Sequence, residues 1–441
     1  FWLKRLQLKP AGCNQIHARA DLALGGWVTD SPGMGCALTA PLAAVASCLG
    51  SCLGSCCCSF LGAGSIRSDQ AAKCLLLWIQ AFATVLALAT TIHPQSWLAP
   101  PCERLGSVGI CVCQGCQDAA ACFAEQIVLR VEAGAVAVFL ALSVVCLSGC
   151  VACAMRSYAV LKFALVLLTA VVLLFVPNGV LSTFGAVASG AAVLFLVAQA
   201  VLVIDFAYAW NEAWFERALA ARRSDAGSRS YRAWQAAILA SAALAVVGAV
   251  AASVIIVLAY PQPATYILLP SVLVVGVAQL LFSITSWCKH GALLTSAVFL
   301  FYSVWLAHQA LVLLPSIATL AWQRWLDLAA CALSLAMLTR SEGLGIVKLA
   351  ASGSSDAEVG DTASAPGAAV CDAGAEHAAD SKVLAAHCAV HAVAAAYIAS
   401  ALAPLSSWIT FGLRAAALAV AMTMYGWSLI APQLLPKRTF V

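Results

Sequence analysis

Ten long apolar runs most constrain what this chain can fold into. Each is about 20 residues or longer, enough for an α-helix to cross a hydrocarbon core of about 30 Å. A helix also satisfies its own backbone hydrogen bonds where water is absent. We therefore predict an all-α, polytopic membrane protein with about ten transmembrane helices. The expected spans are residues 74–92, 133–155, 157–176, 180–209, 233–259, 264–287, 291–314, 316–338, 383–403 and 408–431.

Composition supports a chain that is solvated by lipid. Hydrophobic residues make up 63% of the 441 residues and charged residues only 10%, whereas about a quarter of the residues in a typical soluble domain are charged. The eighth expected span is the weakest, because Gln323, Arg324 and Asp327 interrupt its first half.

The basic residues predict the side of the membrane that each loop faces. If the segment before the first span is cytosolic, fourteen Lys and Arg residues lie at cytosolic ends and loops. The opposite side then holds only Arg104, Arg130, Arg324 and Arg414. By the positive-inside rule this asymmetry favours cytosolic N- and C-termini. We expect an integral protein of an endomembrane or the plasma membrane.

The N-terminal part divides into two segments before the first span. Residues 1–33 do not begin with Met and lack the apolar core of a signal peptide, so we treat them as an extension and expect Met34 to be the start residue. The Cys/Gly-rich segment 34–66 is expected to associate with the membrane. Gly35 is a myristoylation candidate and Cys36 a palmitoylation candidate. A short buried helix, or an eleventh span at 38–60, remains an alternative.

Residues 67–340 contain the first eight expected spans and a Cys-rich loop at 93–126. On the predicted topology this loop is lumenal, where disulfides form. The disulfide candidates are Cys102, Cys111, Cys113, Cys116 and Cys122. Five cysteines cannot all pair within the loop, and Cys113 with Cys116 also fits a redox Cys-x-x-Cys pattern. We favour structural bridges.

The segment 341–382 is rich in Ala, Gly, Ser and acidic residues and poor in bulky apolar ones, so we expect a disordered cytosolic loop. It is either a plain linker or a docking loop for trafficking partners. Residues 383–441 then hold the last two spans and the C-terminal tail.

A polar packet lies on the fourth expected span. Asp205, Tyr208 and Glu212 fall at i, i+3 and i+7, on one face of a helix, with Asn211 beside Glu212. Trp210 and Trp214 share the adjoining face. This band either anchors the helix at the membrane interface or contacts lipid headgroups.

Ionisable residues within spans are costly and therefore candidate sites. Lys162 either extends its ammonium group to the cytosolic headgroups or pairs with Asp205 or a lipid phosphate. We expect Asp205 to matter more than Asp327, which lies near an interface with Arg324 three residues earlier. His387 and His391 stand four apart, but no further ligands are evident in the sequence, so we expect packing and no metal.

Several of these motifs resemble the serine incorporator family of membrane proteins. Residues 205–214 are similar to its Asp-Phe-Ala-His-x-Trp-Asn-Glu-x-Trp signature, with Tyr208 at the usual His position. The resemblance covers about residues 34–436. Other matching segments are Met34-Gly35-Cys36, Leu129-Arg130-Val131, Lys162-Phe163, Trp325-Leu326-Asp327 and residues 425–432. It implies two helical subdomains around a long diagonal fourth helix.

The resemblance also implies a connection with phospholipids or with serine. Our first hypothesis is passage of phospholipids between leaflets without ATP, with Lys162 and the band at 205–214 contacting headgroups. The second is a serine-binding accessory for phosphatidylserine and sphingolipid synthesis, and the third is a structural modifier of membrane properties. The sequence contains no hydrolase, Walker or dinucleotide motif. We expect no enzyme activity, no cofactor and no nucleic-acid partner; the oligomeric state stays open.

Overall fold

Ten α-helices make up the regular structure in the described part of the chain. The computed structural model describes residues 69–92, 119–147, 159–223, 227–285, 293–314, 321–340, 369–404 and 407–434. The helices are α3 (Asp69–Ile92), α5 (Ala119–Leu147), α7 (Ala159–Leu173), α8 (Asn178–Arg223), α9 (Gly227–Ala259), α10 (Pro263–Ile284), α11 (Leu293–Leu311), α12 (Ala321–Arg340), α14 (Ala369–Leu402) and α15 (Trp408–Leu434). Each coincides with one expected span, which confirms the all-α class.

Seven of these helices are long and apolar enough to cross a membrane: α5, α8, α9, α10, α11, α14 and α15. Shorter apolar stretches occur in α3 (Lys73–Ala89) and α7 (Leu161–Leu173). Helix α12, the weakest span in the sequence, is not among them. Its first half carries Arg324 and Asp327, which occupy positions that a lipid-facing helix would give to apolar residues.

Two helices begin earlier than the sequence indicates. Helix α5 starts at Ala119, so the last part of the expected loop 93–126 is helical and Arg130 lies well inside the helix. Helix α14 starts at Ala369, inside the segment 341–382 that we expected to be disordered. Both extensions are rich in alanine, the strongest helix former, which offsets their lack of bulky apolar residues. Residues 341–368 lie outside the described part of the chain.

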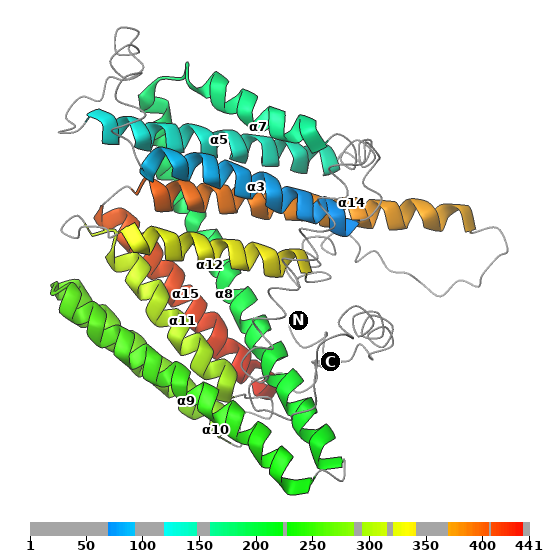
Figure 1. The fold of residues 1–441 in the computed structure, drawn as a ribbon, viewed down its shortest axis with the longest axis vertical. Coiled ribbons are helices and arrows are strands. Elements are labelled where there is room, and N and C mark those ends of the chain that lie inside the picture. Colours follow the sequence, from blue (N-terminus) through cyan, green and yellow to red (C-terminus); the bar gives the residue numbers. More distant parts are fainter. Residues whose placement is uncertain are drawn as a thin grey trace, which may run out of the picture.

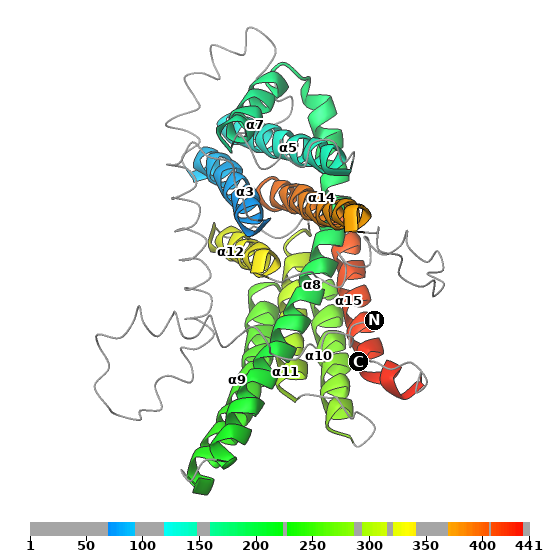
Figure 2. The same ribbon diagram turned by 90° about the vertical axis from the view of Figure 1, so that its right-hand side faces the viewer.

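The helices form two groups joined by one long helix (Figures 1 and 2). In the first group α5 packs against α3, α7 and α14; in the second, α11 packs against α9, α10 and α15. The 46-residue helix α8 contacts α14 and α5 on one side and α9, α11 and α15 on the other. It descends diagonally through Figure 1 from the first group to the second, as the family resemblance implies.

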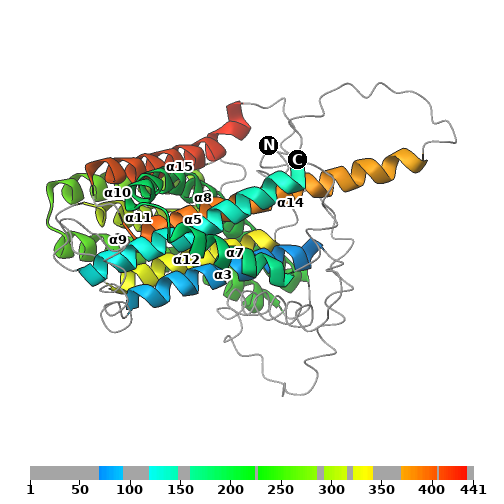
Figure 3. The same cartoon turned by 90° about the horizontal axis from the view of Figure 1, so that it is seen from above.

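Helix α12 lies between the two groups and packs against α3, α14 and α8. One side of the bundle, at the left of Figure 1, holds the ends of five helices and the starts of the other five. The ends are those of α3, α7, α9, α11 and α14, and the starts are those of α5, α8, α10, α12 and α15. We call this side the cavity end, because a small cavity lies there. From the basic-residue asymmetry we predict that it faces away from the cytosol. The far end of α14 projects on the opposite side (Figure 3).

The outer helices display apolar side chains to their surroundings. Helix α9 exposes Leu244 and Ile255, and α10 exposes Ile267 and Val274. Such continuous apolar surfaces are unfavourable in water but match the acyl chains of a bilayer. The outer surfaces of α9 and α10 are therefore expected to face lipid.

Helix α5 approaches α7 closely, and one arginine secures the turn that follows. A Cβ atom on Gly134 would lie 2.9 Å from Thr169 Oγ1 and 3.2 Å from the backbone nitrogen of Ala170. Arg130 donates hydrogen bonds to the carbonyl oxygens of Leu173 (3.1 Å) and Val176 (3.3 Å) and to Asn178 Oδ1 (2.7 Å). Helix ends leave carbonyl groups without intrahelical partners. Arg130 thus fastens the end of α7 to the start of α8.

Candidate functional site

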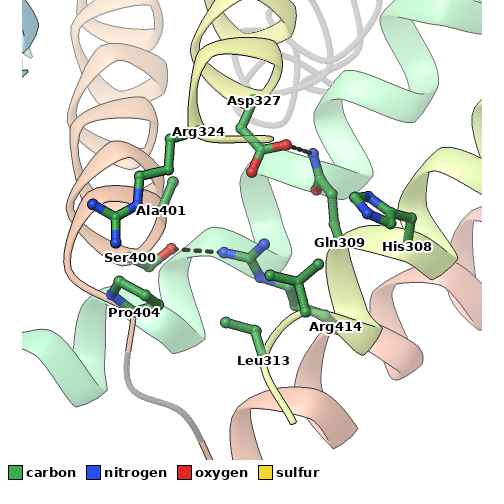
Figure 4. Close-up of a pocket in the computed structure, with 10 residues that line it drawn as sticks. His308, Gln309, Leu313, Arg324, Asp327, Ser400, Ala401, Pro404 and Arg414 are labelled. Carbon is green, nitrogen blue, oxygen red and sulfur yellow. Dashed lines mark hydrogen bonds between the residues drawn. The ribbon is translucent and has the colours of Figure 1, made fainter. Parts of the chain in front are cut away.

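A small polar cavity lies at the cavity end, where the two helix groups meet (Figure 4). Its walls come from the ends of α11 and α14 and the starts of α12 and α15. Its volume is ≈ 20 Å³, room for roughly one water molecule. The lining residues are His308, Gln309, Val312, Leu313, Arg324, Asp327, Ser400, Ala401, Pro404 and Arg414.

Gln309 connects three helices at this cavity. Its Nε2 atom donates hydrogen bonds to Asp327 Oδ1 (2.8 Å) and to the hydroxyl of Tyr397 (3.0 Å), joining α11 to α12 and α14. Gln309 is 2% exposed and Tyr397 is fully buried. Asp327 itself is half-buried, and its carboxylate is held by this buried amide. Its loss should disturb the protein more than the sequence suggested.

Two arginines place positive charge beside this carboxylate. Arg414 on α15 is 5% exposed; it donates to Ser400 Oγ (3.1 Å), and its guanidinium carbon lies 5.6 Å from the centre of the Tyr397 ring. Arg324 on α12 has a buried Nε with no hydrogen-bond partner in the described residues. Guanidinium groups stay charged in proteins. Two fixed positive charges and one negative charge thus line the cavity.

A second polar cluster lies deeper in the bundle, around Gln199 of α8. Its Nε2 donates to Ser334 Oγ (3.0 Å) and to the carbonyl of Ala330 (3.3 Å) on α12. Its Oε1 accepts a hydrogen bond from the hydroxyl of Tyr302 on α11 (3.3 Å). Sequence reasoning missed Gln199. The available signal was a lone amide within the uncharged run between Asn178 and Asp205.

The band expected on the fourth span lies in the second half of α8. Asp205, Tyr208 and Asn211 are half-buried and Glu212 is exposed. At 100° per residue Asp205 lies about 240° around the helix from Gln199, so this band and the Gln199 cluster occupy different faces. The structure does not bring the band to the cavity. It remains a separate candidate site for headgroups.

The two tryptophans of the band pack against other rings. Trp210 and Trp214 meet edge to face with ring centres 5.3 Å apart, and Trp214 meets Trp234 of α9 at 6.0 Å. Trp214 is only 2% exposed. Arg217 lies 5.7 Å from the centre of the Trp234 ring. These contacts fasten α8 to α9, so in this structure Trp214 serves packing.

Lys162 lies too far from Asp205 to pair with it. It is 5% exposed on α7 and lies near Cys146 and Cys388 of the first group. Helix geometry places Asp205 about 40 Å along α8 from Asn178, whereas Lys162 is only about 17 Å from the end of α7. The two side chains are therefore too far apart to pair. The two residues stand at different distances from the turn between α7 and α8, so even side-by-side packing of these helices would not bring them together.

His387 and His391 lie inside the first group. Both are buried, and neither imidazole has a hydrogen-bond partner among the described residues. His391 packs on Phe139 with ring centres 5.3 Å apart. Within the described ranges, no three His, Cys, Asp or Glu side chains are arranged to hold a metal ion.

Most of the acylation and disulfide candidates lie outside the described residues. Gly35 and Cys36 lie outside the described residues, and so do four loop cysteines, Cys102, Cys111, Cys113 and Cys116. Cys122 falls in the first turn of α5. Both sets remain predictions.

One comparison with known proteins bears on this arrangement. The model of a protein family described as serine incorporator (Serinc) matches residues 46–331. The match covers well over half of the chain and includes α3, α5, α7, α8 and the helices up to the middle of α12. Asp327 and Arg324 fall within it, and Arg414 lies beyond its end.

Proposed function

Because the chain belongs to the serine incorporator family of integral membrane proteins, we propose that it moves phospholipids between the two leaflets without ATP. Such movement needs polar groups for the headgroup within the bundle, while the acyl chains stay in the bilayer. It needs neither a nucleophile nor a nucleotide, because passage between leaflets can run down a concentration gradient.

The observation that carries the proposal is the charged cavity between the two helix groups. Arg324 and Arg414 have the planar, charged donors that suit a phosphate group. Charged side chains are expensive inside a membrane bundle and commonly mark a substrate path. The cavity now has room for about one water molecule. Admission of a phosphate therefore requires the helix ends around the cavity to move apart.

Two further features support a polar path beside α8. The Gln199 cluster places an amide and two hydroxyl groups deeper in the bundle. The half-buried Asp205 and Tyr208 lie farther along the same helix, toward the end opposite the cavity.

The proposal is tested with purified protein in liposomes that carry leaflet-labelled phospholipids, without nucleotide. We expect wild-type protein to accelerate exchange between leaflets. Arg414→Gln removes one charge-assisted interaction worth about 1.5–3 kcal/mol, which corresponds to a rate loss of roughly 10- to 100-fold. Arg232→Gln changes an exposed arginine of α9 and should leave the rate unchanged. An unchanged leaflet distribution with well-reconstituted wild-type protein would refute lipid movement.

Serine binding is the second candidate, and the same cavity favours it. A free amino acid carries a carboxylate and an ammonium group, and Arg414 and Asp327 offer the opposite charges. Lys162 and Asp205 carry the same pair of charges but lie too far apart to bind one amino acid together. Saturable binding of labelled serine to wild-type protein, lost in Asp327→Asn, would support this candidate over lipid movement.

A further inference from the structure

The contact between α3 and α5 contains a carboxyl group that is completely enclosed. Glu132 is 0% exposed and Gln80 is 2% exposed. Gln80 Nε2 approaches Glu132 Oε2 at 3.5 Å, a long hydrogen bond. The other oxygens of both side chains, Glu132 Oε1 and Gln80 Oε1, are buried without a hydrogen-bond partner in the described residues. The contact therefore has more acceptors than donors.

The nearest arginine does not neutralise this carboxyl group. Arg130, two residues earlier, directs its guanidinium away to Gln126, to the end of α7 and to Asn178. Within the described part of the chain, Glu132 makes no ion pair. An isolated carboxylate in a low-dielectric interior costs so much free energy that such a group takes up a proton instead.

A single proton resolves the shortage of donors. On Glu132 Oε1 it forms an O–H donor, and Gln80 Oε1 is an acceptor without a donor in the same contact. A metal cation needs about six oxygen ligands. The described oxygens here are the two of Glu132, one of Gln80 and the hydroxyl of Thr84, which lies 3.5 Å from Gln80 Nε2.

We propose that Glu132 and Gln80 form a proton-binding site in the membrane interior, and that its proton joins α3 to α5. Glu132 lies eight residues inside the span that starts at Ala124, about 12 Å along the helix. The site does not depend on lipid movement.

The other titratable groups near this site lie on the helices packed around it. Helix α8 has none between residues 179 and 204. His391 packs on Phe139, seven positions along α5 from Glu132, or about 10 Å. The groups are Glu125 and Arg130 on α5, Lys73 and Cys74 on α3, Lys162 on α7, Arg324, Asp327 and Cys331 on α12, and His387, Cys388, His391 and Tyr397 on α14.

The proposal predicts how stability depends on pH. In the folded protein Glu132 keeps its proton at neutral pH, whereas in the unfolded chain a glutamate releases it near pH 4.3 or above, roughly its ordinary value. The folded state thus binds more protons than the unfolded state. Stability must then fall as the pH rises above this value. Glu132→Gln, which imitates the protonated acid in shape and donor count, should remove this component.

Thermal unfolding of the full chain in nanodiscs between pH 5 and 9 provides the test. The melting temperature of wild-type protein should fall across this range, and that of Glu132→Gln should fall less. Glu216→Gln, which changes an exposed glutamate of α8, should behave like wild type. Infrared spectra of wild-type protein at neutral pH should contain the carbonyl band of a protonated carboxyl group that Glu132→Gln lacks.

Three outcomes would overturn the proposal. The first is a Glu132→Gln protein that fails to fold, because the neutral amide should replace a neutral acid. The second is a spectrum in which the protonated carboxyl band persists in Glu132→Gln. The third is a melting temperature that sodium chloride raises over choline chloride in wild type but not in Glu132→Gln, which would identify a sodium site instead.

Discussion

Replacing Gln309 by Leu tests the hydrogen-bond network at the cavity. Leu is similar in size but cannot form hydrogen bonds, so both bonds from Gln309 Nε2 are lost. A bond to a charged acceptor such as Asp327 contributes about 1.5–3 kcal/mol, and a bond to a neutral acceptor such as Tyr397 about 0.5–1.5 kcal/mol. We expect the free energy of unfolding to fall by about 2–4.5 kcal/mol.

Gln279→Leu is the matched control. Gln279 of α10 also joins two helices, because its Nε2 donates to the carbonyl of Met422 on α15 (2.8 Å). Like Gln309, it has a buried Oε1 without a partner in the described residues. This variant loses one bond to a neutral acceptor, or about 0.5–1.5 kcal/mol. The difference between the two variants therefore isolates the charged bond to Asp327.

Reversible unfolding in mixed micelles, with a rising fraction of a denaturing detergent, measures both free energies under the same conditions. The two variants should unfold at clearly different detergent fractions, with Gln309→Leu first. Equal losses would show that the Asp327 carboxylate is well solvated and that the cavity does not enclose it. In that case the reasoning about charge in the cavity would fail.

Three further predictions concern packing, the α8 band and topology. Gly134→Ala should lower the free energy of unfolding by about 1–3 kcal/mol, because the added Cβ meets the backbone of α7. Gly190→Ala is the control and should leave the free energy of unfolding unchanged, because no atom lies within 4 Å of its Cβ position. Equal stabilities of the two variants would contradict the close approach of α5 to α7. If Asp205 contacts headgroups, Asp205→Ala should reach the membrane in normal amount but lose lipid movement in the liposome assay; normal abundance with normal movement would exclude this role. A single cysteine added at the C-terminus should resist an impermeant reagent in intact cells, and its labelling would reverse the predicted topology.

The membrane spans were predictable because apolar length alone dictates them. A run of about 20 apolar residues has few alternatives to a helix in lipid. The role of Gly134 was also predictable, since small residues allow close helix packing. Gly190, a glycine inside the apolar run of α8, has open space at its Cβ position instead, so the presence of a glycine alone does not predict a close approach.

The cavity was not predictable, because its residues come from four helices that are distant in sequence. Arg324 and Arg414 entered the sequence argument only as basic residues on the side opposite the cytosol. Gln309 and Ser400 carry no motif, and amides and hydroxyls are common in spans. Their meeting depends on the order in which helices pack, which a single sequence does not specify. The expected pairing of Lys162 with Asp205 failed for a related reason: α7 and α8 are neighbours in the sequence but are not among the helix pairs that pack together.

The length of α8 has a consequence for the membrane around it. The 26 uncharged residues between Asn178 and Asp205 extend about 39 Å as a helix, against a hydrocarbon thickness of about 30 Å. A tilt of about 40° removes this hydrophobic mismatch. Because α8 packs against both helix groups, a thicker bilayer should make it more upright and shift one group against the other. A change in bilayer thickness would then change the packing of the helix ends that surround the cavity.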